Sequence, residues 1–201
     1  MDDRICDRIY GDFDLVPDGL VSEANLSLTL APSELTAHWQ RCGRVSDFVA
    51  GYIASAFAAT AAAGPGGTLE DGPIFTSIST VFQELIENAA KFSRKREAAI
   101  HVRVRHFSRI LMYEVENTTT PAFAQRFEEY LRQMTEEHDL GALYLRIVES
   151  HLESGADAQR SGIGLLVIRK DHDVRVGVRF SEDDAGRPIV TVRAFQTMGG
   201  V

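Results

Sequence analysis

Apolar and polar residues alternate in short runs along much of the chain. Alternation is clearest at residues 26–30, 100–105, 110–115, 174–180 and 189–195, and a period of two is typical of strands with one buried face. The last four runs form two pairs, each joined by a short polar segment, which predicts two antiparallel hairpins. Residues 10–16 alternate in their centre and end in a Pro-Asp-Gly turn. They predict a further short strand, which can pair with residues 26–30 as a hairpin.

Other segments have apolar residues at intervals of three and four, the spacing of amphipathic helices. One begins at Pro32-Ser33, with Ser33 as N-cap, and runs to about residue 63, where a Gly-Pro-Gly-Gly segment ends it. Trp39 and Cys42 fall on its apolar side and are predicted core residues. A second helix is expected from about residue 74 to 93, two charged helices between residues 122 and 154, and an apolar helix after Ser161-Gly162-Ile163-Gly164.

This order of elements predicts an α/β fold, a two-layer sandwich in which helices cover one face of a mixed, mostly antiparallel sheet. The chain has 201 residues, of which 44% are hydrophobic and 25% charged, an ordinary globular composition. We therefore expect a single domain over residues 1–201, with residues 1–25 as an N-terminal extension.

Charge and composition exclude several classes of function. The net charge is −8 and the basic residues are scattered, which disfavours nucleic acid as a partner. The two cysteines form no disulfide framework, no signal peptide begins the sequence, and the longest weakly polar stretch is too short to span a membrane. A cytoplasmic protein is expected. The six histidines show no spacing typical of zinc.

The helix predicted at residues 74–93 carries the sharpest chemical signal. Glu84, Asn88 and Lys91 are four and three residues apart, so at about 100° per residue they share one face, opposite an apolar stripe. An amide oxygen can bind Mg²⁺, an ammonium can neutralise phosphate, and a carboxylate can deprotonate a hydroxyl group or water. A simple solvated helix face would show the same spacing.

A second signal is the glycine turn at residues 161–165. Ser161-Gly162-Ile163-Gly164-Leu165 runs straight into an apolar helix. Glycine lets the backbone approach a ligand closely, and the free N–H groups at a helix N-terminus attract phosphate. A tight turn that only begins a helix is the alternative.

The two signals, in this order and about 75 residues apart, resemble the GHKL superfamily of ATPases, which includes gyrase, Hsp90, histidine kinases and MutL. The segment from Glu84 to Ser93 resembles its N-box, and residues 161–165 resemble its later glycine box. The resemblance covers about residues 26–195. It is greatest to the stand-alone bacterial anti-sigma-factor serine kinases of the RsbW and SpoIIAB type, and extends to SiaB-like regulators.

The resemblance implies a role for each of these residues. Glu84 would be the catalytic base, Asn88 the Mg²⁺ ligand, and Lys91 a phosphate contact, while Ser161, Gly162, Ile163, Gly164 and Leu165 would bind ATP phosphates. Asn117 stands where the family has its adenine-reading Asp, and the two glycines that normally follow are replaced within the Glu-Asn-Thr-Thr-Thr run at 116–120. An amide lacks the charge of a carboxylate, which implies weaker binding or relaxed nucleotide choice.

Residues 121–160 fall where the family has its ATP lid, and their charged pattern suits either a mobile lid or a plain surface helix pair. Arg126, Arg132, Arg146 and Arg160 are its candidate phosphate contacts. The expected activity is ATP-dependent serine/threonine phosphorylation of a small regulatory partner, of the anti-anti-sigma (STAS-like) or SiaC-like kind, in bacterial partner switching. The alternative is a non-catalytic GHKL-like module that sequesters a regulator. The resemblance also implies a homodimer.

Overall fold

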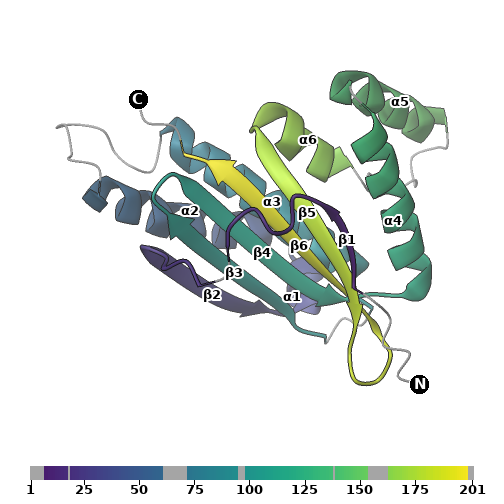
Figure 1. Cartoon of the computed structure of the whole chain (residues 1–201), viewed down its shortest axis with the longest axis horizontal. Helices are drawn as coiled ribbons and strands as arrows, with labels where there is room; N and C mark the ends of the chain where they lie inside the picture. Colours follow the sequence, from purple (N-terminus) through teal and green to yellow (C-terminus); the bar gives the residue numbers. More distant parts are fainter. Residues whose placement is uncertain are drawn as a thin grey trace.

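A six-stranded sheet with helices packed on one of its faces organises the molecule (Figure 1). The computed structural model describes residues 7–17, 19–60, 72–94, 98–137, 139–153 and 163–198. The strand order is β1-β5-β6-β4-β3-β2 and every pair is antiparallel. The strands are β1 (Arg8–Gly11), β2 (Ala24–Leu30), β3 (Ile100–Phe107), β4 (Ile110–Thr118), β5 (Val174–Glu182) and β6 (Pro188–Thr197).

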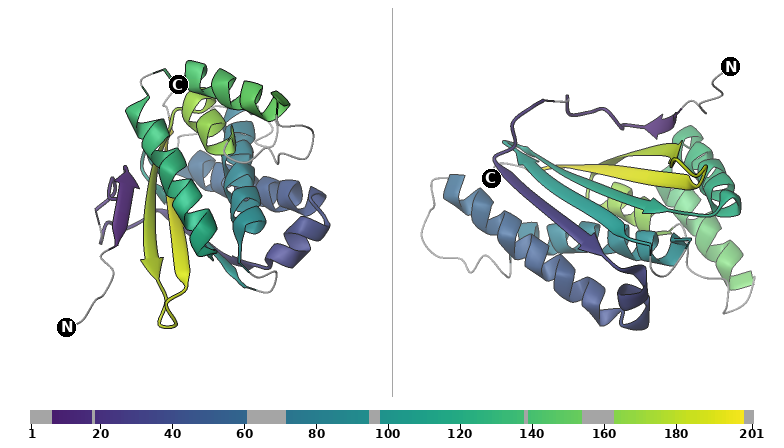
Figure 2. Two further views of the ribbon diagram at one scale, coloured as in Figure 1. Left: turned by 90° about the vertical axis from the view of Figure 1, so that its right-hand side faces the viewer. Right: turned by 90° about the horizontal axis from the view of Figure 1, so that it is seen from below.

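The helices form the second layer. They are α1 (Pro32–Ala37), α2 (Gln40–Thr60), α3 (Pro73–Phe92), α4 (Pro121–Glu136), α5 (Leu140–Glu153) and α6 (Ile163–Asp171). Helices α1, α2, α3 and α6 lie under one face of the sheet, and α4 and α5 stand at its β1–β5 side (Figure 2). The two-layer α/β sandwich predicted from the sequence is confirmed, and its sheet is wholly antiparallel.

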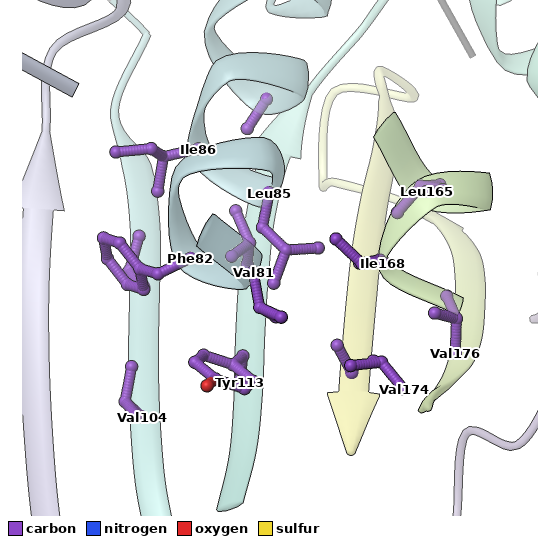
Figure 3. Packing of buried hydrophobic residues seen from close by; sticks show 14 of the residues in the cluster. Val81, Phe82, Leu85, Ile86, Val104, Tyr113, Leu165, Ile168, Val174 and Val176 are labelled. Atoms are coloured by element: carbon purple, nitrogen blue, oxygen red, sulfur yellow. The ribbon is translucent and has the colours of Figure 1, made fainter. Parts of the chain in front are cut away.

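Helix α3 lies at the centre of the core. Its apolar stripe faces the sheet and packs with side chains of β3, β4 and α6 (Figure 3). The fully buried members of this stripe are Ile78, Val81, Phe82 and Ile86. Because this side of α3 is fixed against the sheet, the opposite side, with the charged residues, is held in a definite orientation.

The segment between β1 and β2 runs over the opposite face of the sheet, from the β1 edge to the β2 edge (Figure 2). Val16 packs there against Met112 of β4 and Phe195 of β6, and Phe13 is almost fully buried. The region expected to be an N-terminal extension thus contributes both a strand and a cover to the sheet.

The two predicted hairpins are confirmed as β3–β4 and β5–β6, but the hairpin between the first two strands is wrong. Strand β1 pairs with β5 at one edge, and β2 pairs with β3 at the other. The first strand is also shorter than residues 10–16. Gly11 adopts a positive φ of 67°, a conformation that glycine accepts readily, and the strand ends there.

The single helix predicted from Pro32 to about residue 63 is two helices. His38 leaves the helical conformation, with φ of −143° and ψ of 78°, so α1 ends at Ala37 and α2 begins at Gln40. The break places Leu35 and Cys42 in the core on separate helices. Trp39 lies at the break and is 42% exposed, so its prediction as a core residue is wrong, whereas that of Cys42 is confirmed.

Candidate functional site

The half-buried side of α3 faces the beginning of α6. A Cβ atom built on Gly164, the second residue of α6, would overlap the Glu84 carboxylate and lie 3.2 Å from Asn88 Nδ2. Glu84 and Gly164, which are 80 residues apart in the sequence, therefore lie next to each other in the structure. Any larger residue at this position would have to displace the Glu84 side chain.

Glu84 occupies an unfavourable electrostatic position. Burial raises the pKa of its carboxyl group, and the nearby charge of Glu87 raises it further, while Lys91 lowers it. A carboxyl group that holds its proton to higher pH than usual is common among general acids and bases. Lys91, the third member of the predicted group, is thus close enough to lower the pKa of Glu84.

Asn88 has an unsatisfied polar group. Its Nδ2 atom is buried and has no hydrogen-bond partner, although buried polar groups are paired in the great majority of cases. The cost of such a group is about 1–3 kcal/mol. Together with the raised pKa of Glu84, this marks the junction of α3 and α6 as a place where polar groups lack their normal compensation.

Next to these residues lies a cavity of about 200 Å³. It is enclosed by α3, α4, the start of α6 and the strands β4 and β6, and its walls are mainly apolar and aromatic; the lining includes Leu85, Asn88, Phe92, Val115, Asn117, Phe123, Arg126, Phe127, Tyr130, Leu165, Val190 and Val192. Ligand sites of drug size are typically about 300–1,000 Å³. This one has room for a single flat ring system.

One wall of the cavity is a row of aromatic rings from α3 and α4. Phe123 stacks on Phe92 with ring centroids 4.0 Å apart, and Phe127 lies 5.7 Å from Phe123. Tyr130 continues the row. Sequence reasoning missed this wall, although the residues at 123, 127 and 130 have helical spacing, because an aromatic stripe usually indicates core packing.

The end of β4 lines the cavity, and the residues that follow it contact α3 and α4. Asn117, only 7% exposed, lines the cavity and donates a hydrogen bond from Nδ2 to Thr118 O. Thr119 Oγ1 donates to Phe92 O at 2.7 Å, and Thr120 Oγ1 caps α4 by accepting from Phe123 N. The threonines therefore tie α3 and α4 to the end of β4, which explains their presence in structural terms.

The remaining predicted contacts divide into three groups. Leu165 and Arg126 line the cavity, and Ile163 begins α6. Arg132 and Arg146 instead form ion pairs with Glu129 and Glu137 on the helix surface. Ser161, Gly162 and Arg160, with the end of the predicted lid, lie outside the described residues.

Comparison with known proteins adds no assignment: no model of a protein family matches the chain, and no curated protein does either. Within the described ranges, no three His, Cys, Asp or Glu side chains gather closely enough to hold a metal ion. None of the helices in the described part of the chain is long and apolar enough to cross a membrane.

Proposed function

We propose that the chain is a GHKL-type ATPase domain that binds ATP with Mg²⁺ and acts as a serine/threonine protein kinase on a small regulatory protein in bacterial partner switching. The supporting observation is the junction of Glu84, Asn88 and Gly164 beside an aromatic cavity. A carboxylate, an amide and a close backbone approach at a helix N-terminus are the components that nucleotide phosphates and their metal require.

The residues present fit a bound magnesium nucleotide. Asn88 would supply its amide oxygen to Mg²⁺, while its buried Nδ2, which has no partner, is a donor that suits a phosphate oxygen. Lys91 neutralises phosphate charge, and the backbone N–H groups of residues 162–165 bind phosphate oxygens. The first turn of α6 contains no acidic residue that would repel an anion. A bound Mg²⁺ would reduce the negative charge of the phosphates.

The cavity holds the adenine ring of the nucleotide. A flat ring would lie between the Phe92–Phe123 wall and the strand residues Val190 and Val192, and stacking on aromatic rings favours it. Asn117 is one of the polar residues that line the cavity and recognises the edge of the nucleotide base. Its uncharged amide makes that recognition weaker than a carboxylate would.

Glu84 is the proposed catalytic base, the group that accepts a proton. It accepts the proton of the partner's serine or threonine hydroxyl while that oxygen bonds to the γ-phosphorus and the bond to the β-phosphate oxygen breaks, so that ADP leaves. The raised pKa of Glu84 suits this role, because a base is most effective when its pKa lies near the working pH.

The partner is a small regulatory protein of the STAS-like or SiaC-like kind, and the setting is the cytoplasm. A homodimer is part of the same proposal. Three aromatic residues on or next to α2, Trp39, Phe48 and Tyr52, are between 42% and 61% exposed, which supports an interface on this side. Sedimentation of Phe48→Ser against wild type tests this part, since a dimer that uses α2 dissociates in the variant.

The nucleotide site is tested by calorimetric titration of ATP and ADP, with and without Mg²⁺. We expect saturable binding by the wild-type protein that requires Mg²⁺ and is lost in Asn88→Ala. Asn25→Ala is the matched control, because Asn25 is exposed on β2 at the edge of the sheet. If wild-type protein shows no binding at millimolar nucleotide, the kinase proposal fails.

The assignment of Glu84 is tested by the slow transfer of phosphate to water, which needs no partner. Glu84→Ala should bind ATP normally and release ADP at least about 100-fold more slowly, the usual contribution of a general base. An unchanged rate would show that another group is the base.

A second function, a non-catalytic module that sequesters a regulatory protein, is favoured by one observation. Both glycines of the family's motif are missing after Asn117, and Thr119 and Thr120 use their side chains to hold α3 and α4. This module would bind nucleotide weakly or not at all. Absence of nucleotide binding combined with a monodisperse, folded protein would support it.

A further inference from the structure

Helix α4 presents two different sides to the rest of the molecule. One side, with Phe123, Phe127 and Tyr130, forms the wall of the cavity. The other side carries Glu128, which points to the N-terminal strand β1, the neighbour of α4 at this edge of the sheet (Figure 1). What holds Glu128 therefore also bears on the position of the cavity wall.

Two residues of β1 hold Glu128. The Tyr10 hydroxyl donates a hydrogen bond to Glu128 Oε1, and Arg8 Nε lies 3.0 Å from the same oxygen. The Glu128 side chain is only 12% exposed, so these contacts are shielded from water. Hydrogen bonds to a charged group in such a setting are stronger than neutral ones.

A chain of aromatic contacts runs in parallel from β1 to the cavity. The Tyr10 ring packs edge-on against Phe180 of β5, with centroids 6.0 Å apart, and Phe180 packs against Phe127 at 5.9 Å. Phe127 is followed by Phe123 and Phe92. Strand β1 thus contacts the cavity wall through both a polar and an apolar route.

Two further polar contacts of α4 lie near its ends. Thr120 caps the first turn, and Arg169 of α6 donates to Met134 O near the last. Between these ends, the polar contacts described for Glu128 all come from β1. Strand β1 has four residues and, among the described strands, pairs with β5 at the edge of the sheet, so it is a small edge element.

We propose that Tyr10 and Arg8 are positioning residues that hold α4 through Glu128, so that docking of β1 keeps the aromatic wall in place and release of β1 opens the cavity. The coupling is a property of the fold, whereas its meaning as regulation of nucleotide binding rests on the proposed function. By thermodynamic linkage, a ligand in the cavity also stabilises β1 on the sheet.

The coupling is measured first without any ligand, by amide hydrogen exchange of Tyr10→Phe. This variant keeps the ring on Phe180 and loses only the hydroxyl. We expect amides in the middle of α4 to exchange about tenfold faster, the factor that loss of one charge-assisted hydrogen bond produces, while amides of α5 are unchanged. Thr29→Val, which removes an exposed hydroxyl from β2, is the control.

Glu128→Leu, which removes the acceptor, provides the second variant, and its combination with Tyr10→Phe decides whether one contact is responsible. Both changes remove the hydrogen bond between Tyr10 and Glu128, so their effects on exchange should be less than additive in the double variant. Exchange in α4 that stays within twofold of wild type in folded Tyr10→Phe overturns the proposal. So does strict additivity of the two substitutions.

Titration with ATP then tests whether the docking of β1 affects nucleotide binding in the cavity. If wild-type protein binds ATP, Tyr10→Phe should bind it several-fold more weakly, and ATP should slow exchange in β1 of the wild type. Equal affinity in a variant with loosened α4 would refute the link to the cavity. If the wild type binds no ATP, the proposed function fails, and the ligand-free exchange rates alone decide the coupling.

Discussion

The two faces of the sheet treat their carboxylates in different ways, although the outer face also holds two buried guanidinium nitrogens without a hydrogen-bond partner, Arg105 Nε and Arg179 Nε. On the outer face, Arg193 donates to Glu114 at 2.7 Å and to Phe13 O at 3.2 Å, and its guanidinium lies 4.2 Å from the centre of the Phe13 ring. On the helix-covered face, Glu84 has a raised pKa and Asn88 a buried donor with no partner. Compensated charges stabilise a fold, whereas uncompensated ones weaken it and are typical of sites that bind something else.

The difference is reflected in how closely the backbone is packed. Gly177 of β5 and Gly164 of α6 each have no room for a side chain, but their neighbours differ. A Cβ atom on Gly177 would overlap backbone atoms of Asp12 and Phe13, whereas one on Gly164 would meet only side-chain atoms of Glu84 and Asn88. Backbone cannot yield without moving the outer cover, whereas a carboxylate can rotate away.

The largest effect on stability is therefore expected for Gly177→Ala. The substitution forces the segment at Asp12 and Phe13 off the sheet and should lower the free energy of unfolding by about 3 kcal/mol, the upper end of overpacking costs. Denaturant unfolding measures it. Gly43→Ala is the control: its nearest neighbour is a side-chain atom 3.9 Å away, so removal of a glycine from α2 should stabilise by about 0.5–1 kcal/mol.

Arg193→Met is expected to have the next largest effect. The variant leaves Glu114, whose side chain is only 15% exposed, with Arg103 as its remaining ion-pair partner. We expect a loss of about 1.5–3 kcal/mol in the free energy of unfolding.

The matched control for Arg193 is Arg175→Met on the neighbouring strand β5. Arg175 forms a two-bond ion pair with Asp12, but both side chains are about half exposed, so its loss should cost less than about 1 kcal/mol. Equal losses in the two variants would contradict the view that the pairing of Arg193 is a main stabilising feature of the outer face.

Gly164→Ala should separate stability from function. Helix propensity favours alanine and the displaced Glu84 side chain opposes it, so the free energy of unfolding should stay within about 1 kcal/mol of wild type. ATP binding, if the proposed function is correct, should weaken at least tenfold, about 1.4 kcal/mol. The reverse pattern, lost stability with normal binding, would show that the junction with α3 is only a packing contact.

The parts of the site that the sequence predicts are those with a local signature. Glu84, Asn88 and Lys91 are read from helical spacing, and Gly164 from a glycine at a helix start, so their face and surroundings could be anticipated. The aromatic wall could not, because Phe123 and Phe127 look like the apolar side of any surface helix until α4 is placed against α3.

Errors in the predicted fold arise where distant segments decide the structure. Strand β1 could have paired with β2, its neighbour in sequence, on the evidence of alternation alone. Its true partner β5 lies more than 160 residues away, and the close contact of Gly11 with Val176 O that accompanies the pairing has no local signal. The helix break at His38 likewise depends on packing, since no proline or glycine marks it.

Glu84→Gln should have the smallest effect on the free energy of unfolding, and the sign of this change shows whether a buried charge destabilises the wild-type protein. The folded-state pKa of Glu84 is raised above its ordinary value of 4.5, so as pH rises the unfolded chain loses this proton first and the wild-type protein loses stability across the interval between the two pKa values. Glutamine has no proton to lose. The variant should therefore be slightly more stable than wild type at pH 7, and the advantage should vanish below pH 4, about the value at which both states of Glu84 are protonated.

Unfolding free energies measured across this pH range for Glu84→Gln test this expectation, with Glu34→Gln on the exposed side of α1 as the control. An advantage that persists unchanged at low pH would mean that packing of the amide, rather than relief of a buried charge, stabilises the variant, and the contrast between the two faces would lose its electrostatic basis.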